Sequence, residues 1–329
     1  MTRFVLKKLG GAVLVLLVLS AAVYALFYLA PGDPARLACG ERCSPQQVAQ
    51  VRDQLGLNES VFAQYGHFLQ GLVAGRDYSA GTGTLHCDAP CLGFSYQNDR
   101  QVTELILERL PATFSLALGA LVLWLVIGVG TGLLSALRRG GITERALTVL
   151  TLAGTGTPVF ILGLLLLMLV CAYLQWLPFP TYVPFTEDPE QWAWNLLLPW
   201  ITLGFFESAK YARLTRSSTL ETLAEDHIRT FRAYGVGERA IVTRHALRGA
   251  VAPVVALSAI DLGTMMGGAV LTESLFGIPG LGKTLIDGVR VIDLPVVVGV
   301  VLVIGAAVVI AGALADLLYA VADRRVTLA

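Results

Sequence analysis

The sequence predicts an all-α polytopic membrane protein with six transmembrane helices and a small extracytoplasmic segment after the first helix. Of its 329 residues, 55% are hydrophobic and 15% are charged, and the mean hydropathy is +0.67. A soluble domain averages about 25% charged residues, so this chain is depleted in charge. Its apolar residues also form long runs, and a bilayer core requires about 20 apolar helical residues per crossing.

The first apolar run, Leu9–Leu29, follows the basic residues Arg3, Lys7 and Lys8. Because the apolar region of a cleaved signal peptide usually has about 7–15 residues, this longer run is predicted to remain as a helix. The other five runs are Ala112–Ala136, Leu147–Leu174, Leu196–Leu214, Pro253–Leu275 and Leu294–Val321. Six spans place both termini on the same side of the membrane.

The distribution of Lys and Arg predicts that this side is the cytoplasm. Cytoplasmic segments carry an excess of basic residues. Here the segments 1–8, 137–146, 208–252 and 322–329 hold three, three, eight and two, together 16 of the 24 Lys and Arg residues. The net charge is zero and no basic block stands out, which excludes nucleic acid as a partner.

The predicted topology divides the chain into four parts. These are an N-terminal transmembrane helix (1–30), an extracytoplasmic segment (31–110), a five-helix transmembrane core (111–321) with a cytoplasmic loop (217–252), and a cytoplasmic tail (322–329). The outer segment and the inner loop are both longer than a connection between spans requires, so function is expected in them.

The inner loop predicts two short helices separated by a turn. Glycine commonly follows the last helical residue, so the first helix should end at Gly235, with Gly237 in the turn and a second helix continuing to Pro253. Acidic residues lie early in the first helix and basic residues lie late, as the helix macrodipole favours. These residues are Glu225, Asp226, Arg229 and Arg232.

Several motifs together resemble one transporter family. In the inner loop they are Glu225, Asp226, Arg229, Thr230, Arg232, Ala233, Gly235, Arg244–Arg248 and Pro253, and elsewhere Pro31–Pro34, Glu108–Thr113, Arg213–Ser218, Phe276–Gly282, Asp293–Pro295 and Asp316–Tyr319. In this order they resemble the dipeptide, oligopeptide and nickel branch of binding-protein-dependent ABC importer permeases, over essentially the whole chain. Phe231, Tyr234 and Gly249 depart from the family pattern, in which Ala, Lys and Asn are expected.

The resemblance implies the type I ABC importer permease fold and a position in the inner membrane. It implies half of a translocation pathway for peptides, delivered by an extracytoplasmic solute-binding protein. The expected partners are a second homologous permease, two ATP-binding-cassette ATPase subunits and membrane lipid. ATP and Mg²⁺ are expected in the ATPases, so this chain is expected to bind no cofactor and to be no enzyme.

The resemblance also implies that the inner loop is a coupling loop, which transmits ATP-driven closure of the ATPases. The implied coupling residues are Glu225, Asp226, Arg229, Ala233, Gly235 and Arg239. Two alternatives stay open for the cargo of the same assembly, namely nickel or other metal chelates and glutathione-like solutes. An ion-driven secondary transporter is a more distant alternative.

The segment Gly277–Thr284 matches the G-x-x-x-x-G-K-[ST] pattern of ATP-binding loops. That pattern functions when a strand leads into it and a helix leads out, so that backbone N–H groups surround the phosphates. Here an apolar span leads in, so we interpret the match as coincidental. Phe276–Gly282 is instead predicted to form a tight turn at an external gate, with Phe276, Pro279 and Gly280 as gate residues.

Four of the five cysteines lie in the outer segment as two pairs, Cys39 with Cys43 and Cys87 with Cys91. Disulfides persist outside the cytosol, so these residues are disulfide candidates, with three connectivities possible. A metal or iron–sulfur site is the alternative, although a spacing of three residues between cysteines is less typical of it. We expect disulfides and no metal.

Charged residues at membrane depth usually face a cavity or a partner. Asp261 lies within the fifth span and is predicted to line the translocation pathway with Met265 and Glu273. The alternative for Asp261 is an ion pair with a Lys or Arg of a neighbouring helix, and for Glu273 simple solvation at the outer end. Glu207 and Lys210, spaced i,i+3, are predicted to form a structural pair.

Overall fold

The computed structural model describes residues 2–29, 35, 44–54, 58–80, 83–95, 97–138 and 140–322. The chain divides into two compact units. The first comprises Met1–Thr113 with Pro279–Val309, and the second comprises Phe114–Ile278 with Ile310–Ala329. Two long helices, α5 (Val102–Leu137) and α14 (Leu294–Ala322), each contribute one part to each unit.

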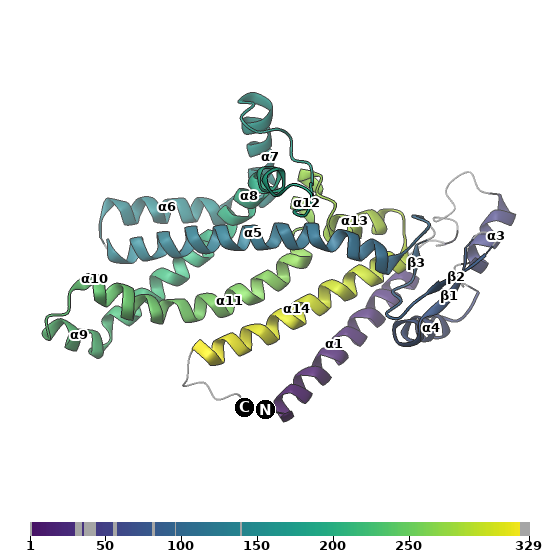
Figure 1. Ribbon diagram of the computed structural model, residues 1–329, viewed down its shortest axis with the longest axis horizontal. Helices are drawn as coiled ribbons and strands as arrows, with labels where there is room; N and C mark the ends of the chain where they lie inside the picture. Colours follow the sequence, from purple (N-terminus) through teal and green to yellow (C-terminus); the bar gives the residue numbers. More distant parts are fainter. Residues whose placement is uncertain are drawn as a thin grey trace. The chain divides into compact units, whose positions relative to one another are not determined.

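The first unit combines helices with two small antiparallel sheets (Figure 1). Besides parts of α5 and α14 it contains α1 (Thr2–Leu29), α3 (Pro45–Gln54), α4 (Val61–Ala74), β1 (Arg76–Ala80), β2 (Gly83–Cys87), β3 (Phe94–Ser95), β4 (Arg100–Gln101) and α13 (Leu281–Arg290). Strand β1 pairs with β2, with Arg76 opposite Cys87, and β3 pairs with β4. The fold was predicted as all-α, but this unit also contains four short strands among the described residues.

Two apolar clusters form the core of the first unit. The larger joins the start of α5 to α13 and α14, and its buried members are Leu92, Val102, Leu105, Ile106, Leu281, Val296 and Val300. The smaller joins α1, α4 and α14 through Tyr24, Phe68 and Val298. Helices α1 and α14 approach closely at Gly305, where an added methyl group would lie 2.7 Å from Leu19 Cδ2.

The second unit is built around α8 (Pro189–Ala224), a 36-residue helix that packs against α6, α7 and α11. The other elements are α6 (Ile142–Gly156), α7 (Val159–Leu166), the π-helix η1 (Leu167–Tyr173), α9 (Asp226–Ala233), α10 (Glu238–Ala240), the π-helix η2 (Ile241–Ala246), α11 (Leu247–Gly268) and α12 (Val270–Phe276). Asp188 caps α8 by accepting hydrogen bonds from the amides of Glu190 and Gln191, both at 3.0 Å.

By length and composition, two helices in the described residues could cross a membrane, α5 and Leu294–Leu318 of α14. Two bent pairs raise this number to four, α6 with α7 and η1, and α11 with α12. Helix α8 is long enough, but Glu207, Lys210, Arg213 and Arg216 lie within it. Six spans therefore remain a prediction.

Three expected boundaries differ from the observed ones. The run Leu147–Leu174 is bent by 100° after α6, where Thr157 and Pro158 separate two helices. Proline disfavours helical geometry in the residue before it, which accounts for the break. Pro253 does not end the second inner helix, because it lies inside α11, and α5 begins ten residues before the predicted Ala112.

Candidate functional site

The inner loop forms a helical hairpin tip that joins α8 to α11 (Figure 1). Helix α8 ends at Ala224, and the extended backbone of Glu225 redirects the chain into α9. Gly235 adopts a left-handed φ of 79° after α9, and its amide donates to the carbonyl of Arg232 at 3.0 Å. The predicted helix stop at Gly235 is confirmed.

Opposite charges connect the two sides of the tip. Arg232 donates from Nε to Glu238 Oε1 at 2.6 Å and from Nη2 to Oε2 at 3.3 Å, which closes α9 onto α10. This hydrogen-bonded pair lowers the pKa of Glu238 and raises that of Arg232. Ile228 on α9 is fully buried, so its side chain packs this helix against the rest of the unit.

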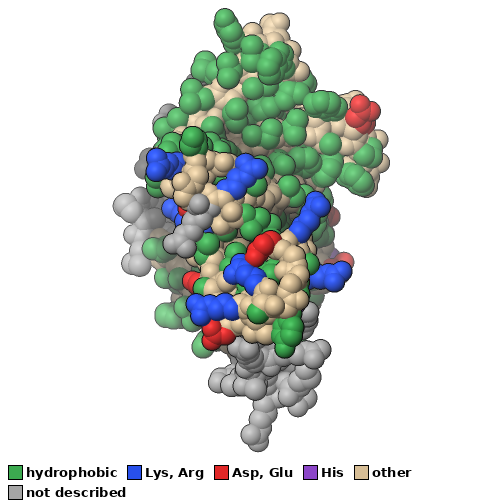
Figure 2. Space-filling view, turned by 90° about the vertical axis from the view of Figure 1, so that its left-hand side faces the viewer, with side chains coloured by type: hydrophobic (Ala, Val, Ile, Leu, Met, Phe, Trp, Pro, Cys, Tyr) green, Lys and Arg blue, Asp and Glu red, His purple; other side chains and the backbone are tan. Residues whose placement is uncertain are grey.

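The six predicted coupling residues, Glu225, Asp226, Arg229, Ala233, Gly235 and Arg239, are all exposed on this tip. Figure 2 shows basic and acidic side chains gathered on the face that carries α9 and α10. Asp226 Oδ1 and Arg229 Nη1 are 3.4 Å apart. Four of the six residues are charged, so the tip presents an exposed, charged surface.

The structure explains two of the three residues that depart from the family pattern, Phe231 and Gly249. Phe231 stacks on His245 of η2 at a centroid distance of 4.3 Å and meets His227 edge-on at 6.0 Å. An added methyl group at Gly249 would lie 2.7 Å from Thr222 Oγ1, so glycine permits α11 to approach α8. Tyr234 is 83% exposed, and nothing in the structure explains its side chain.

A charged network joins α8 to α11 in the second unit. Asp261 Oδ2 accepts a hydrogen bond from the Tyr211 hydroxyl at 2.6 Å and lies 2.6 Å from Lys210 Nζ. Lys210 Nζ also lies 3.2 Å from Glu207 Oε2, which confirms the predicted pair. The alternative of an ion pair for Asp261 is thus what the geometry shows, and its pathway role stays a prediction. Two carboxylates against one ammonium leave this network with a net negative charge.

The other predicted pathway residues are both buried. Met265 on α11 is 9% exposed, and Glu273 on α12 is fully buried. The alternative of simple solvation for Glu273 is therefore wrong, because its carboxyl lies in the protein interior. A buried carboxyl is costly unless it is partnered, which makes this position more constrained than the sequence suggested.

The segment after α12 forms the tight turn that was predicted. Phe276 is buried, Gly277 has a left-handed φ of 68°, and the amide of Ile278 donates to the carbonyl of Glu273 at 2.9 Å. Pro279 and Gly280 follow, and α13 begins at Leu281. Because helix α12 leads into Gly277–Thr284 where an ATP-binding loop requires a strand, the interpretation of a coincidental match is confirmed.

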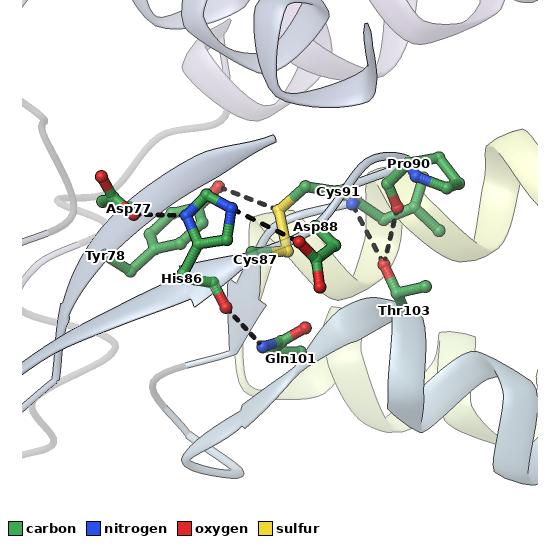
Figure 3. Close-up of a disulfide and its surroundings, with 10 residues drawn as sticks. Asp77, Tyr78, His86, Cys87, Asp88, Pro90, Cys91, Gln101 and Thr103 are labelled. Carbon is green, nitrogen blue, oxygen red and sulfur yellow. Dashed lines mark hydrogen bonds and ion pairs between the residues drawn. A yellow bond between two sulfur atoms is a disulfide. The ribbon is translucent and has the colours of Figure 1, made fainter. Parts of the chain in front are cut away.

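In the outer segment, Cys87 and Cys91 form a disulfide that is almost fully buried (Figure 3). The Cys91 amide donates to the carbonyl of Gly71 on α4 at 3.2 Å. Thr103 on α5 donates to the carbonyl of Pro90 at 3.0 Å, so the disulfide loop contacts two helices. The disulfide prediction is confirmed for this pair, while Cys39 and Cys43 lie outside the described residues.

His86 lies beside the disulfide between two carboxylates (Figure 3). Its Nδ1 is 2.6 Å from Asp77 Oδ1 and its Nε2 is 3.4 Å from Asp88 Oδ1. The hydrogen bond to Asp77 raises the pKa of the exposed His86 imidazole. In the part of the chain that the structure describes, no three His, Cys, Asp or Glu side chains are grouped as metal ligands.

Comparisons with known proteins cover almost the whole chain. Residues 1–117 match the N-terminal part of the binding-protein-dependent transport system membrane component, and residues 128–328 match the binding-protein-dependent transport system inner membrane component. A peptide transport system permease of Brucella abortus (strain 2308) is 36% identical over 326 residues, which is 99% of each chain. This chain belongs to the binding-protein-dependent transport permease family.

A second relative and a solved structure agree with this assignment. A glutathione transport system permease of Pectobacterium atrosepticum is 34% identical over 320 residues, 97% of each chain. The inward-facing MetNI methionine ABC transporter has a TM-score of 0.54 at 18% identity, over 68% of this chain and 98% of that chain, and shows the permease fold. The protein is thus a multi-pass inner-membrane permease subunit of an ABC importer and is not itself the ATPase.

Two contacts that stabilise this permease were not predicted from the sequence. Tyr211 holds Asp261 from the adjacent helix, and its ring stacks on Trp124 at 6.0 Å. The sequence feature that pointed to this contact was the position of Tyr211 directly after Lys210. The buried Asp293 accepts a hydrogen bond from Ser95, and no local pattern joins two residues so far apart in the sequence.

Proposed function

We propose that this chain forms half of a translocation pathway for di- and oligopeptides, which an extracytoplasmic solute-binding protein delivers. The observation that carries this proposal is the full-length similarity, at 36% identity over 326 residues, to a permease named for peptide transport. The α9–α10 tip supports it, because an importer of this kind needs an exposed segment through which partner subunits drive it.

In the proposed assembly, the chain pairs with a second homologous permease and with two ATP-binding-cassette ATPases that bind ATP and Mg²⁺. The tip 225–239 docks into a groove of one ATPase. Its exposed charges suit a protein surface, and Ile228 holds α9 onto the permease while the outer face stays accessible. ATP-driven approach of the two ATPases then moves α9 together with α8 and α11.

We further propose six membrane spans with both termini in the cytoplasm, which places 31–110 outside and the coupling loop 217–252 inside. In this arrangement Asp261, Met265 and Glu273 line the pathway, the buried Met265 and Glu273 becoming exposed when it opens, and Phe276, Pro279 and Gly280 form the external gate. The net negative charge of the Glu207, Lys210 and Asp261 network supports attraction of a peptide amino group.

A glutathione-like solute is the second candidate cargo, because a relative at 34% identity is named for glutathione transport. Glutathione is itself a modified tripeptide, so both cargoes present carboxylates and an amino group. A metal chelate has less support, since Cys87 and Cys91 are joined in a disulfide and offer no thiolates.

The test is co-expression of the chain with its genomic neighbours, purification in mild detergent and reconstitution into proteoliposomes. We expect a second permease and ATPase subunits to co-purify, and uptake of a labelled dipeptide to require both ATP and the binding protein. Uptake of glutathione at the expense of dipeptides would favour the second cargo. Uptake by the chain alone, driven by an ion gradient, would contradict the proposal.

A further inference from the structure

The first unit contains a polar pocket of about 360 Å³, to which the transport scheme above assigns no ligand and which Pro279 of the proposed gate also lines. Its walls come from three segments, namely the β3–β4 turn, the start of α5, and α13 with the beginning of α14. Small-molecule sites in proteins have cavity volumes of about 300–1,000 Å³ with a few convergent polar groups. The pocket therefore has the dimensions of a site for a short peptide or a part of one.

Charged, amide and apolar side chains together line this pocket. Arg109 comes from α5, Lys283 and Asp287 come from α13, and Gln97 and Asn98 come from the β3–β4 turn. Two cations against one carboxylate give the walls an excess of positive charge. Leu105 and Val296, both buried members of the larger apolar cluster, also line the pocket.

The Arg109 guanidinium is available for a ligand. Its Nη2 lies 3.8 Å from Glu108 Oε1, beyond normal hydrogen-bond distance, while Glu108 is held at 2.9 Å by Arg100. The Arg109 side chain is 31% exposed and lines the pocket. A guanidinium of this kind is suited to bind a carboxylate with two parallel hydrogen bonds.

Buried contacts hold the pocket walls in place. The Asn98 side-chain amide donates to Ser95 Oγ at 2.9 Å, and Ser95 in turn donates to the buried carboxyl group of Asp293. The start of α13 is fixed by the Leu281 amide, which donates to Thr113 Oγ1 at 2.7 Å. Such pre-organisation lowers the entropy cost of binding a ligand.

We propose that this pocket binds the C-terminal carboxylate of the transported peptide, with Arg109 and Lys283 as its cationic ligands. This inference rests on the proposed function for the identity of the cargo. Gln97 and Asn98 add side-chain amides to the same walls. The Asp287 carboxyl group, also in the walls, would attract the amino group of a short peptide. Lys283 thus has a proposed role in binding, although Gly277–Thr284, the segment that contains it, does not form an ATP-binding loop.

The direct test measures binding to the complex of both permeases and the ATPases, without the binding protein. The probe is N-acetyl-Ala-Ala, which carries one carboxylate, compared with its C-terminal amide by saturation-transfer difference NMR. We expect the acid to bind about tenfold more tightly than the amide, since hydrogen bonds to charged groups are of that strength. Equal binding of the acid and the amide would overturn the proposal.

Variants assign the effect to the pocket. Lys283→Gln and Arg109→Gln should each weaken binding of the acid about tenfold and remove its advantage over the amide, whereas Lys283→Arg should retain it. Arg290→Gln is the matched control, because Arg290 lies exposed on the same helix and does not line the pocket. Preference for the acid that survives in Lys283→Gln, or is lost in Arg290→Gln, would contradict the proposal.

Two further measurements separate this inference from its rivals. Binding of the acid with the expected variant pattern, but no ATP-dependent peptide uptake by the wild type, would refute the proposed function and leave the carboxylate site standing. If Lys283→Gln instead raises the concentration of binding protein needed to stimulate ATP hydrolysis, with the acid preference intact, the pocket is a docking surface for that protein. That outcome would overturn the inference.

Discussion

Residues 75–103, a part of the outer segment with strands β1–β4, and residues 225–246, a part of the inner loop with α9, α10 and η2, are stabilised in different ways. The outer segment is held by a buried disulfide between Cys87 and Cys91 and by the buried contact of Ser95 with Asp293. The inner segment is held by an exposed ion pair, Arg232 with Glu238, and by stacking of Phe231. The difference indicates that the outer segment is a rigid scaffold and the inner one a surface kept available for a partner.

The two segments also respond to pH in opposite directions. The raised pKa of His86 means that its stabilisation is present below the ordinary value of 6.5 and is lost as pH rises through the pKa of the folded state. The lowered pKa of Glu238 means that its stabilisation is present above the ordinary value of 4.5 and is lost as pH falls through the folded-state pKa. Both contacts are therefore present between the two ordinary values, while a rise in pH weakens the His86 contact and only stronger acid weakens the Glu238 contact.

Removal of the disulfide should give the largest effect. The Cys87→Ala/Cys91→Ala double variant is expected to lower the free energy of unfolding by about 2 kcal/mol, because the unfolded chain loses a short closed loop. Thermal unfolding of the complex in nanodiscs measures this change. Cys171→Ala is the control, since that cysteine is reduced and buried in the other unit. An equal loss of stability in both variants would contradict the scaffold role.

A change in the inner segment should affect transport more than stability. Phe231→Ala removes the stack on His245 and should lower ATP-driven peptide uptake about tenfold, equivalent to about 1.4 kcal/mol, while the complex still assembles. The ratio of peptide transported to ATP hydrolysed measures this coupling. The conservative variant Phe231→Tyr should retain it, because the ring can still stack. Full uptake in Phe231→Ala would show that the stack does not position the coupling segment.

Variants of Asp293 separate the effect of its charge on stability from the effect of its hydrogen bond. Burial raises the pKa of this carboxyl, so its ionised form is disfavoured and stability should increase as pH falls through the folded-state pKa. Asp293→Asn keeps an oxygen that can accept from Ser95, so it should be more stable than Asp293→Ala by about 1 kcal/mol. Denaturation at several pH values tests this, and Asp293→Asn should lose the dependence. Equal stability of the two variants would exclude the hydrogen bond as a source of stability.

The smallest effect is expected at His86. His86→Gln should remove the weak stabilisation of the β1–β2 hairpin by mild acid and leave the pH response of the inner segment unchanged. Hydrogen exchange of residues 76–87, measured above and below the ordinary histidine pKa, checks this. A pH response that persists in His86→Gln would assign it to another group.

The sequence predicted the class of fold because hydropathy depends on composition over long windows. It missed the early start of α5, where Leu105 and Ile106 are buried and Glu108 is exposed, because such an amphipathic turn lowers the average hydropathy. The break at Thr157–Pro158 follows the rule that proline disfavours a helical conformation in the residue before it. Pro253 nevertheless lies inside α11, so proline alone does not decide where a helix ends.

The sequence predicted some features of the candidate site and not others, because the two kinds of feature depend on different interactions. The helix stop at Gly235 depends on local backbone geometry, so the sequence predicts it. The contact of Asp261 with Lys210 and Tyr211 joins α11 to α8, and Tyr211 and Asp261 are 50 residues apart in the sequence. The pairing of cysteines likewise depends on tertiary structure. Contacts of this kind become visible only when the packing of the helices is known.

The central claim is that the inner segment, and not the outer one, is the surface to which a partner ATPase binds. The most direct test incorporates the photocrosslinker p-benzoylphenylalanine in place of Tyr234, whose side chain is 83% exposed. Irradiation of the assembled complex should give an adduct with an ATPase subunit, identified by mass spectrometry. The same crosslinker at the exposed Asp88 of the outer segment should give no such adduct. An ATPase adduct from position 88, or none from position 234, would contradict the account.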